Sequence, residues 1–342
     1  MIIKLDAIGD VLRSTVILPK LKASYPHSHI TWLTRTASAQ LLQGNPFVDD
    51  VWLLDTPETI ARLAVSEWDL AINLDNAFPS SSLMAQARAQ KRIGYTLATD
   101  GVITPTNEAA EAWIAMASFD RLKKENALSY QAHMYAICGF SKPIELPVLV
   151  LDSQRRTEAR EAICAGWIQP GDFLVGLNTG AGGRWPLKMM SEARQTDLIR
   201  TILETPNRKV LLLGGPGEKE RNRRLAAKFS PDRVRDAGCE HDLLDFAARV
   251  DLCNAMICGD TLALHVATAL QVPTIVVFCP TSMAEIHDYN GLLIKLRPAD
   301  CPCYCSYNRD CPDGKDCINR IPLDLMEQAL VRQLARGRIS AR

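Results

Sequence analysis

An acid, a hydroxyl and an imidazole lie close together in segment 259–265, and these groups suit a nucleotide that carries a sugar. The segment lies between two apolar runs, 255–258 and 272–278, which are predicted to be buried strands of a parallel sheet. It therefore joins a strand to a helix, at the carboxyl edge where open α/β sheets bind ligands. A helix N-terminus at this edge offers unpaired N–H groups to a phosphate. The candidate ligand-binding residues are Asp260, Thr261 and His265.

A glycine-rich stretch, 178–186, offers a second anion site after the predicted strand 173–177. Three glycines in four positions would let backbone N–H groups wrap a phosphate. Arg184 would add a charged contact to a diphosphate, and Lys188 is a further candidate cation. No Gly-Lys-Ser/Thr follows, so the stretch is not a Walker A loop. A surface turn that binds no ligand is the alternative interpretation.

Two acidic side chains also follow predicted strands, and each allows two interpretations. Gly9 permits a tight turn, and Asp10 after it either caps the first helix or acts as a general base on an acceptor hydroxyl. Glu218, in the glycine-rich turn 214–220, either accepts hydrogen bonds from a nucleoside or favours the helix dipole. The histidines other than His265 show no useful spacing and are predicted to be surface or structural residues.

Five of the eleven cysteines fall within the 17 residues 301–317, among turn-forming residues. Such a loop brings thiolates to one point, which predicts a structural tetrathiolate site for zinc or iron. Reduced or partly disulfide-bonded cysteines are the alternative. Cys301 is expected not to bind the metal. The preferred ligand set is Cys303, Cys305, Cys311 and Cys317.

Composition excludes several classes of protein. The formal net charge of the 342 residues is zero, which argues against a general nucleic-acid binder. No apolar run reaches the roughly 20 residues that span a bilayer. The opening Met1–Leu5 is followed by Asp6 and Asp10, so no signal peptide is expected. We therefore expect a cytoplasmic protein, in which thiols stay reduced.

Short apolar runs alternate with helical patterns in both halves of the chain, which predicts an α/β protein with parallel sheets. We expect two Rossmann-like domains, 1–150 and 151–325, facing a central cleft, and a C-terminal helix or tail at 326–342. The predicted strands are 2–5, 30–33, 51–54, 70–74, 173–177, 210–213, 255–258 and 272–278. The predicted helices include 11–25, 191–205 and 217–229.

Four motifs, at 5–12, 178–186, 214–218 and 259–265, occur in an order and at separations that resemble the ADP-heptose:lipopolysaccharide heptosyltransferases, glycosyltransferase family 9. The resemblance covers nearly the whole chain. It implies a GT-B fold and an inverting transfer from a nucleotide-activated heptose that needs no metal. Two positions depart from the family, since Gly183 stands where a lysine is frequent and Leu262 where many members have glycine.

The resemblance also implies roles for residues. The aspartate that matches Asp10 is the base, and the acid that matches Glu218 contacts the nucleoside. Thr179 and the pair Asp260–Thr261 match positions that hold the phosphates and the sugar. The full set expected to bind the sugar nucleotide is Gly9, Asn178, Thr179, Gly180, Arg184, Lys188, Glu218, Asp260, Thr261 and His265.

The predicted function is therefore heptosyl transfer from ADP-heptose to a hydroxyl of a lipopolysaccharide core sugar. The first domain would present the acceptor and the second would bind the donor. Three alternatives stay open: transfer to a protein hydroxyl, a sugar-nucleotide epimerase or hydrolase of the same fold, and a non-catalytic metal-binding assembly module. No nucleic-acid partner is expected, whereas peripheral contact with the inner membrane and a homo-oligomer stay open.

Overall fold

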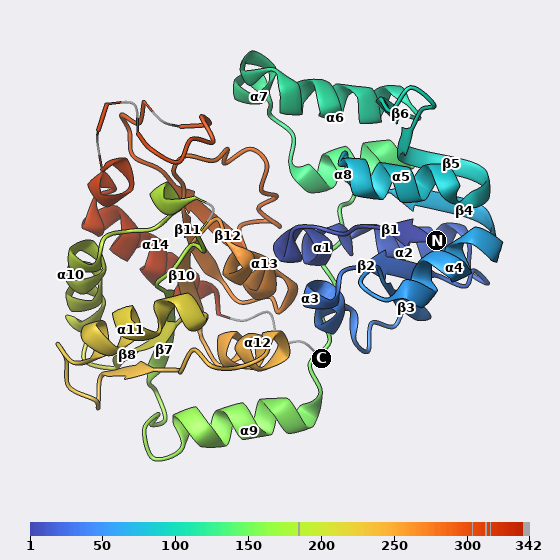
Figure 1. Ribbon diagram of the computed structural model, residues 1–342. Coiled ribbons are helices and arrows are strands. Elements are labelled where there is room, and N and C mark those ends of the chain that lie inside the picture. The colour runs from blue at the N-terminus through green and yellow to red at the C-terminus, as the bar shows by residue number, and fades with distance from the viewer. Residues whose placement is uncertain (184, 303, 312, 315, 338–342) are drawn as a thin grey trace. The chain divides into compact units, whose positions relative to one another are not determined.

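The computed structural model describes residues 1–342 except 184, 303, 312, 315 and 338–342 (Figure 1). The chain forms two compact units, each built on one sheet. The first unit comprises Met1–Val150 and the short segment Ala284–His287. The second comprises Leu151–Met283 and the chain from Asp288 on.

The sheet of the first unit has the strand order β3-β2-β1-β4-β5-β6. All neighbours are parallel except β5 and β6, which pair antiparallel. In register, Ile2 lies opposite Trp32 on one side and Ile72 on the other. The strands are β1 (Ile2–Ile3), β2 (Thr31–Thr34), β3 (Asp50–Leu53), β4 (Glu67–Asn73), β5 (Arg88–Leu97) and β6 (Ile103–Pro105).

Helices cover both faces of this sheet, because successive residues of its central strands point to opposite sides. Ile2 lies in one buried cluster and Ile3 in another. The helices are α1 (Ile8–Ser14), α2 (Ile17–Ser24), α3 (Thr36–Ala39), α4 (Pro57–Val65), α5 (Phe78–Gln86), α6 (Glu108–Ser118), α7 (Asp120–Glu125) and α8 (Tyr130–Cys138), with a 3-10 turn η1 (Gln40–Leu42).

The single helix predicted over 11–25 is wrong in detail, since α1 and α2 are separate helices there. Pro19 accounts for the break. Its nitrogen carries no hydrogen for a bond to the carbonyl of Thr15, and its ring would clash with that carbonyl in a continuous helix.

The sheet of the second unit has the strand order β12-β11-β10-β7-β8-β9, and all its neighbours are parallel. Its central strand β10 is buried throughout. The strands are β7 (Phe173–Asn178), β8 (Arg208–Leu213), β9 (Val234–Asp236), β10 (Ala255–Gly259), β11 (Thr274–Val277) and β12 (Leu293–Leu296).

The second unit adds six α-helices and three 3-10 turns among the described residues. The C-terminal helix begins at Leu323, three residues before its predicted start, and its buried side chains join the core of this unit. The helices are α9 (Ser153–Cys164), α10 (Glu192–Leu203), α11 (Lys219–Ala226), α12 (Leu243–Asp251), α13 (Leu262–Ala269) and the C-terminal helix α14 (Leu323–Arg336). The 3-10 turns are η2 (Pro186–Lys188), η3 (Pro216–Glu218) and η4 (Cys317–Arg320).

Numbered within its own unit, each sheet has the order 3-2-1-4-5-6 of the Rossmann fold. The predicted α/β class with two Rossmann-like domains is therefore confirmed. In this order the chain reverses direction across the sheet between strands 1 and 4, and ligands bind at the carboxyl ends of these strands. They are β1 and β4 in the first unit and β7 and β10 in the second. Across the described residues, none of the helices is both long and apolar enough to cross a membrane.

Candidate functional site

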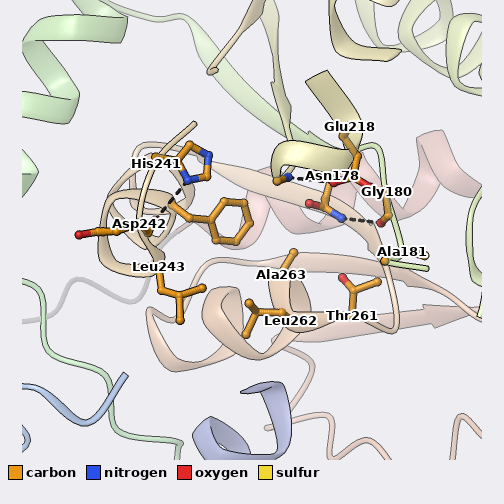
Figure 2. Close-up of a pocket in the computed structure, with 13 residues that line it drawn as sticks. Asn178, Gly180, Ala181, Glu218, His241, Asp242, Leu243, Thr261, Leu262 and Ala263 are labelled. Carbon is orange, nitrogen blue, oxygen red and sulfur yellow. Dashed lines mark hydrogen bonds between the residues drawn. The ribbon is translucent and has the colours of Figure 1, made fainter. Parts of the chain in front are cut away.

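A cavity of about 280 Å³ opens at the carboxyl ends of β7 and β10, where the Rossmann order predicts a ligand (Figure 2). Its wall comes from four segments: the loop after β7, the loop after β8, the start of α12 and the start of α13. The volume is close to the lower end of the range for small-molecule sites. Three of the four motifs, 178–186, 214–218 and 259–265, therefore contribute to one site.

The loops after β7 and β8 are locked together at this cavity by Glu218. Its Oε2 accepts a hydrogen bond from the backbone N of Gly215 at 2.9 Å. A Cβ at Gly180 would overlap the Glu218 carboxylate, so only glycine allows the two loops to come this close. Asn178 Nδ2 donates to the Gly180 carbonyl at 2.8 Å, which closes the turn (Figure 2). The predicted residues Asn178, Gly180 and Glu218 thus lie side by side.

Asp260 lies beside this wall and has two side-chain partners. The sequence analysis singled out one of them, Lys188, but not the other, Thr281. Lys188 Nζ contacts its Oδ2 at 2.8 Å, and the Thr281 hydroxyl donates to the same oxygen at 2.8 Å. Burial alone would raise the pKa of Asp260, but the charges of Lys188 and His265 and the two hydrogen bonds lower it to about 2. The carboxylate is therefore ionised at neutral pH, and Lys188 is fixed at the same edge.

Two buried polar atoms among the residues that line the cavity have no hydrogen-bond partner in the described part of the chain. They are Thr261 Oγ1 and His241 Nε2. A buried polar group without a partner costs stability, and such groups concentrate where a ligand completes the hydrogen bonding. Thr261 is the N-cap position of α13, and its side chain makes no capping bond.

One end of the cavity is apolar and aromatic, a feature that sequence reasoning missed. The His241 and Phe246 rings stack with centroids 5.6 Å apart at 26°. Leu243 lines the same end of the cavity as His241 (Figure 2). A flat apolar wall with one polar nitrogen suits a nucleobase. The signal in the sequence was Asp242, which caps α12 by accepting from Asp245 N at 2.7 Å. Because Asp242 caps α12, His241 lies at the end of the loop before this helix.

Besides Asp260 and Lys188, which lie beside the wall, three described residues of the predicted donor set do not line this cavity. The Thr179 hydroxyl points into the protein and donates to Asn222 Oδ1 at 2.5 Å. His265 is buried one turn into α13, where its charge acts on Asp260. Gly9 belongs to the other unit. Arg184 lies outside the described residues.

The carboxyl ends of β1 and β4 in the first unit carry a second group of polar residues. Lys4 and Asp75 form a buried ion pair, and Asp75 Oδ2 also accepts from Leu5 N at 2.6 Å. Burial alone would lower the pKa of Lys4, but Tyr130 and Asp75 raise it above the ordinary value for lysine. The pair fixes the loop that leads from β1 into α1.

Asp10 follows in the first turn of α1, where both interpretations of its role stay open. Its Oδ2 accepts from Ala7 N at 3.3 Å, as a helix-capping carboxylate would. Its side chain is also 33% exposed, so an acceptor hydroxyl can reach it. Gly9 immediately precedes it within the helix.

The structure describes four of the five cysteines in the loop 301–317. Cys305 and Cys317 are buried and Cys311 is half-buried, while Cys303 lies outside the described residues. Within the described ranges, no three His, Cys, Asp or Glu side chains come close enough to hold a metal ion. The spare residue, Cys301, instead has its Sγ 3.4 Å from that of Cys279, which the sequence indicated to be a core residue.

Aromatic residues of the same loop contact the segments around the carboxyl ends of β7 and β10. Tyr307 packs edge-on against Trp185 with ring centroids 6.3 Å apart. The Tyr304 hydroxyl accepts from Met283 N at 3.1 Å, two residues after Thr281. The cysteine loop therefore supports the chain on both sides of Asp260.

Known structures share this fold. A glycosyltransferase family 9 protein from Veillonella parvula superposes with a TM-score of 0.79 at 20% identity, covering 98% of this chain and 96% of the other. ADP-heptose lipopolysaccharide heptosyltransferase II from E. coli gives 0.72 at 17% identity, covering 98% of each chain. The iron-containing dodecameric glycosyltransferase TibC from enterotoxigenic E. coli gives 0.57 at 12% identity, covering 98% of this chain and 75% of TibC. The fold is thus GT-B, as predicted.

Sequence comparison gives the family. Lipopolysaccharide heptosyltransferase 1 of Escherichia coli K12 is 24% identical over 310 residues, which cover 84% of this chain and 90% of the relative. The profile of glycosyltransferase family 9 (heptosyltransferase) matches residues 58–315, which is most of the chain. With the cavity at the predicted sheet edge, these matches show that the chain belongs to glycosyltransferase family 9, the heptosyltransferase family, and is a glycosyltransferase.

Proposed function

We propose that this enzyme transfers heptose from ADP-heptose to a hydroxyl of a lipopolysaccharide core sugar, with inversion at the anomeric carbon. The observation that carries the proposal is the cavity at the β7–β10 edge, whose wall holds two buried polar atoms without a partner in the described chain. Membership of a heptosyltransferase family supports the sugar, and the apolar end of the cavity supports the nucleotide.

The donor is proposed to lie along the cavity from base to sugar. The adenine would pack against Phe246 and meet His241 Nε2, and Glu218 would accept hydrogen bonds from the nucleoside. The N–H groups after β7, Thr261 at the start of α13, Arg184 and Lys188 would hold the diphosphate. Lys188 is already fixed at this edge by Asp260.

The reaction is proposed to use Asp10 as the general base. Its carboxylate takes the proton from the acceptor hydroxyl as that oxygen bonds to the anomeric carbon. The bond from this carbon to the diphosphate oxygen breaks on the opposite face, and ADP leaves with the electron pair. Preorganised donors around the diphosphate stabilise this charge, and loss of one such donor typically costs about 3 kcal/mol of barrier.

The two units are proposed to divide this work. Residues 1–150 present the acceptor and residues 151–325 bind the donor. The cytoplasmic location, the contact with the inner membrane and the homo-oligomer expected from the sequence stay predictions.

Product analysis tests the function. The purified enzyme is incubated with ADP-heptose, UDP-sugars or GDP-sugars and with a heptose-accepting core oligosaccharide, and the acceptor is analysed by mass spectrometry. One added heptose from ADP-heptose alone is expected, and NMR should show the anomeric configuration inverted. Transfer only to a protein acceptor, or conversion of the donor without acceptor, would replace this proposal by one of the open alternatives.

We also propose that the cysteine loop holds one structural metal ion, zinc or iron. The contact of Cys301 with Cys279 supports a thiol centre at this place, although the described residues do not complete it. A closed thiolate site would brace the loop that carries Tyr304 and Tyr307 and would take no part in the transfer.

Elemental analysis of protein purified without added metal tests the metal proposal. About one equivalent of zinc or iron is expected. Cys279→Ser and Cys305→Ser distinguish a site that includes Cys279 from the set predicted from the sequence. Cys138→Ser, a buried cysteine of the first unit, is the control and should leave the metal content unchanged. Less than about a tenth of an equivalent in the wild type would contradict the proposal.

A further inference from the structure

The proposed base, Asp10, is held by a cation one turn further along α1. Arg13 Nε lies 2.9 Å from Asp10 Oδ1, while Asp10 Oδ2 accepts from Ala7 N at 3.3 Å. The two carboxylate oxygens therefore have different partners, one on each side. An ion pair of this spacing on a helix surface contributes little by itself. Arg13 differs from such a surface residue because its side chain is only 12% exposed.

Arg13 is in turn held by an aromatic ring from α8. Its Cζ lies 3.6 Å from the centroid of the Tyr130 ring, and Tyr130 is buried. Stacking between a guanidinium and a ring strengthens when both are removed from water. Lysine cannot reproduce this contact, because only the planar guanidinium can stack on the ring and pair with a carboxylate at the same time.

Hydrogen bonds fix the ring itself. The Ser14 hydroxyl donates to the Asp10 carbonyl at 2.6 Å and lies 2.7 Å from the Tyr130 hydroxyl. Since Ser14 uses its single hydrogen for the carbonyl, the Tyr130 hydroxyl must donate to Ser14. Burial raises the pKa of Tyr130, which keeps this donor protonated. The contacts thus close a ring of residues: Asp10, Arg13, Tyr130 and Ser14.

Two further titratable groups in the described part of the chain lie near Asp10. Lys4 on β1 is the second cation whose charge reaches Asp10, and it is paired with Asp75. Tyr130 on α8 is neutral. Among the described residues, Arg13 contacts the Asp10 carboxylate directly, and its removal changes the charge beside the base without breaking the Lys4–Asp75 pair.

We propose that Arg13 is a positioning residue for the base: clamped on Tyr130, it orients the Asp10 carboxylate and keeps it ionised. This inference rests on the proposed role of Asp10. It assigns Arg13 two separable effects. Its charge disfavours protonation of the base, and its planar stacking fixes the direction of the carboxylate.

The two effects have different signatures in the dependence of kcat/KM on pH, measured at saturating donor. Arg13→Gln should move the acid limb to higher pH by about one unit or more, the usual effect of losing an opposite charge at this distance. It should also lower the plateau roughly tenfold, because a misdirected base is slow. Arg13→Lys should restore the acid limb but not the plateau.

Arg121→Gln is the matched control, since it removes an arginine that is 75% exposed on α7 of the same unit. It should behave as wild type. Circular dichroism and the KM for the donor establish that each variant is folded. If Arg13→Gln does not fold, Arg13→Lys carries the test through its plateau.

A wild-type acid limb and plateau in Arg13→Gln, or a wild-type plateau in Arg13→Lys where only that variant folds, would overturn the inference. Parallel measurement of Asp10→Asn separates this outcome from failure of the proposed function. If Asp10→Asn loses activity while the Arg13 variants keep it, only the role of Arg13 is contradicted. If Asp10→Asn keeps full activity, the role of Asp10 as the base is contradicted.

Discussion

At the proposed donor site, single residues contribute both to the fold and to the proposed binding. Asp260 is ionised because Lys188, His265 and Thr281 outweigh its burial. The same ion pair fixes Lys188 where a diphosphate would need a cation. Thr261 differs from Asp260, because its hydroxyl is buried without a hydrogen-bond partner among the described residues. One residue therefore stabilises the free protein, and the other is available to the ligand.

The ionised state of Asp260 predicts how stability depends on pH. Its pKa falls from 3.8 unfolded to about 2 folded, so the carboxylate stabilises the fold above pH 3.8 and loses this contribution as the pH falls towards about 2. Asp260→Asn should lower the free energy of unfolding by roughly 2 kcal/mol at pH 6. The difference from wild type should shrink in acid. Urea unfolding at several pH values measures it.

Asp197→Asn is the control for this experiment, since Asp197 is half-exposed and pairs with Arg200 on the surface. It should change stability by less than about 0.5 kcal/mol. A difference between Asp260→Asn and wild type that stayed constant from pH 6 to pH 3 would contradict the assignment.

Thr261→Val tests whether the unpartnered hydroxyl serves the ligand. Valine keeps the shape and removes the polar atom, so the free protein should be as stable as wild type or more so. The affinity for ADP should fall about fivefold to tenfold, the worth of one hydrogen bond. Calorimetry and thermal unfolding measure the two effects. Loss of stability with unchanged affinity would show that the hydroxyl has a structural partner.

Residue types at strand ends could be predicted from the sequence, but their partners could not. Asp260 and Thr261 follow a recognisable buried strand, and this alone puts them at the ligand edge. The pairing of Asp260 with Lys188 joins residues far apart along the chain and depends on where β7 and β10 meet. His241 was missed for the same reason, because its role comes from the packing of α12.

At the scale of elements, the donor site depends on loops that approach one another closely. Gly180, after β7, leaves the space that Glu218, after β8, occupies. Their strands are neighbours in the sheet, so both loops emerge at the same edge. The carboxylate then ties its own loop through Gly215 N.

Gly180→Ala should therefore displace Glu218 and break this arrangement. The added methyl group overlaps the carboxylate, so we expect a loss of about 1–3 kcal/mol of stability and at least tenfold weaker binding of ADP. Gly183→Ala is the matched control in the same loop, because a Cβ there would meet no described atom within 4 Å beyond its chain neighbours. Calorimetry measures the affinity of both variants for ADP. Equal affinities would mean that Glu218 has no part in the site.

Eight strands were predicted from apolar runs, including the two-residue β1, and four others were missed. The eight predicted strands all have counterparts, whereas β5, β6, β9 and β12 were missed. β5 begins with charged and polar residues, and its place is set by pairing with β4. β9 and β12 are short outer strands of the second sheet. Tertiary pairing, rather than a local pattern, makes such segments strands.

For the whole molecule, alternation of strands and helices was enough to predict two Rossmann-like units, since the handedness of βαβ connections leaves few topologies. The return of Ala284–His287 to the first unit was not predictable, because no local pattern marks it. Nor could the sequence give the contact of Cys279 with Cys301, which joins the end of β11 to the cysteine loop.

Each unit carries one half of the proposed chemistry, the base in the first and the donor cavity in the second. A single substitution in the first unit should therefore affect catalysis without affecting donor binding. Asp10→Asn keeps the size and the hydrogen bond from Ala7 N but removes the basic oxygen. It leaves the donor cavity of the second unit untouched.

The most direct test is the rate of heptosyl transfer by Asp10→Asn beside its affinity for ADP. The account predicts a rate lower by roughly 10²–10⁴, the usual contribution of a general base, with wild-type affinity and a wild-type melting temperature. A near-normal rate would contradict the account and leave Asp10 as the cap of α1.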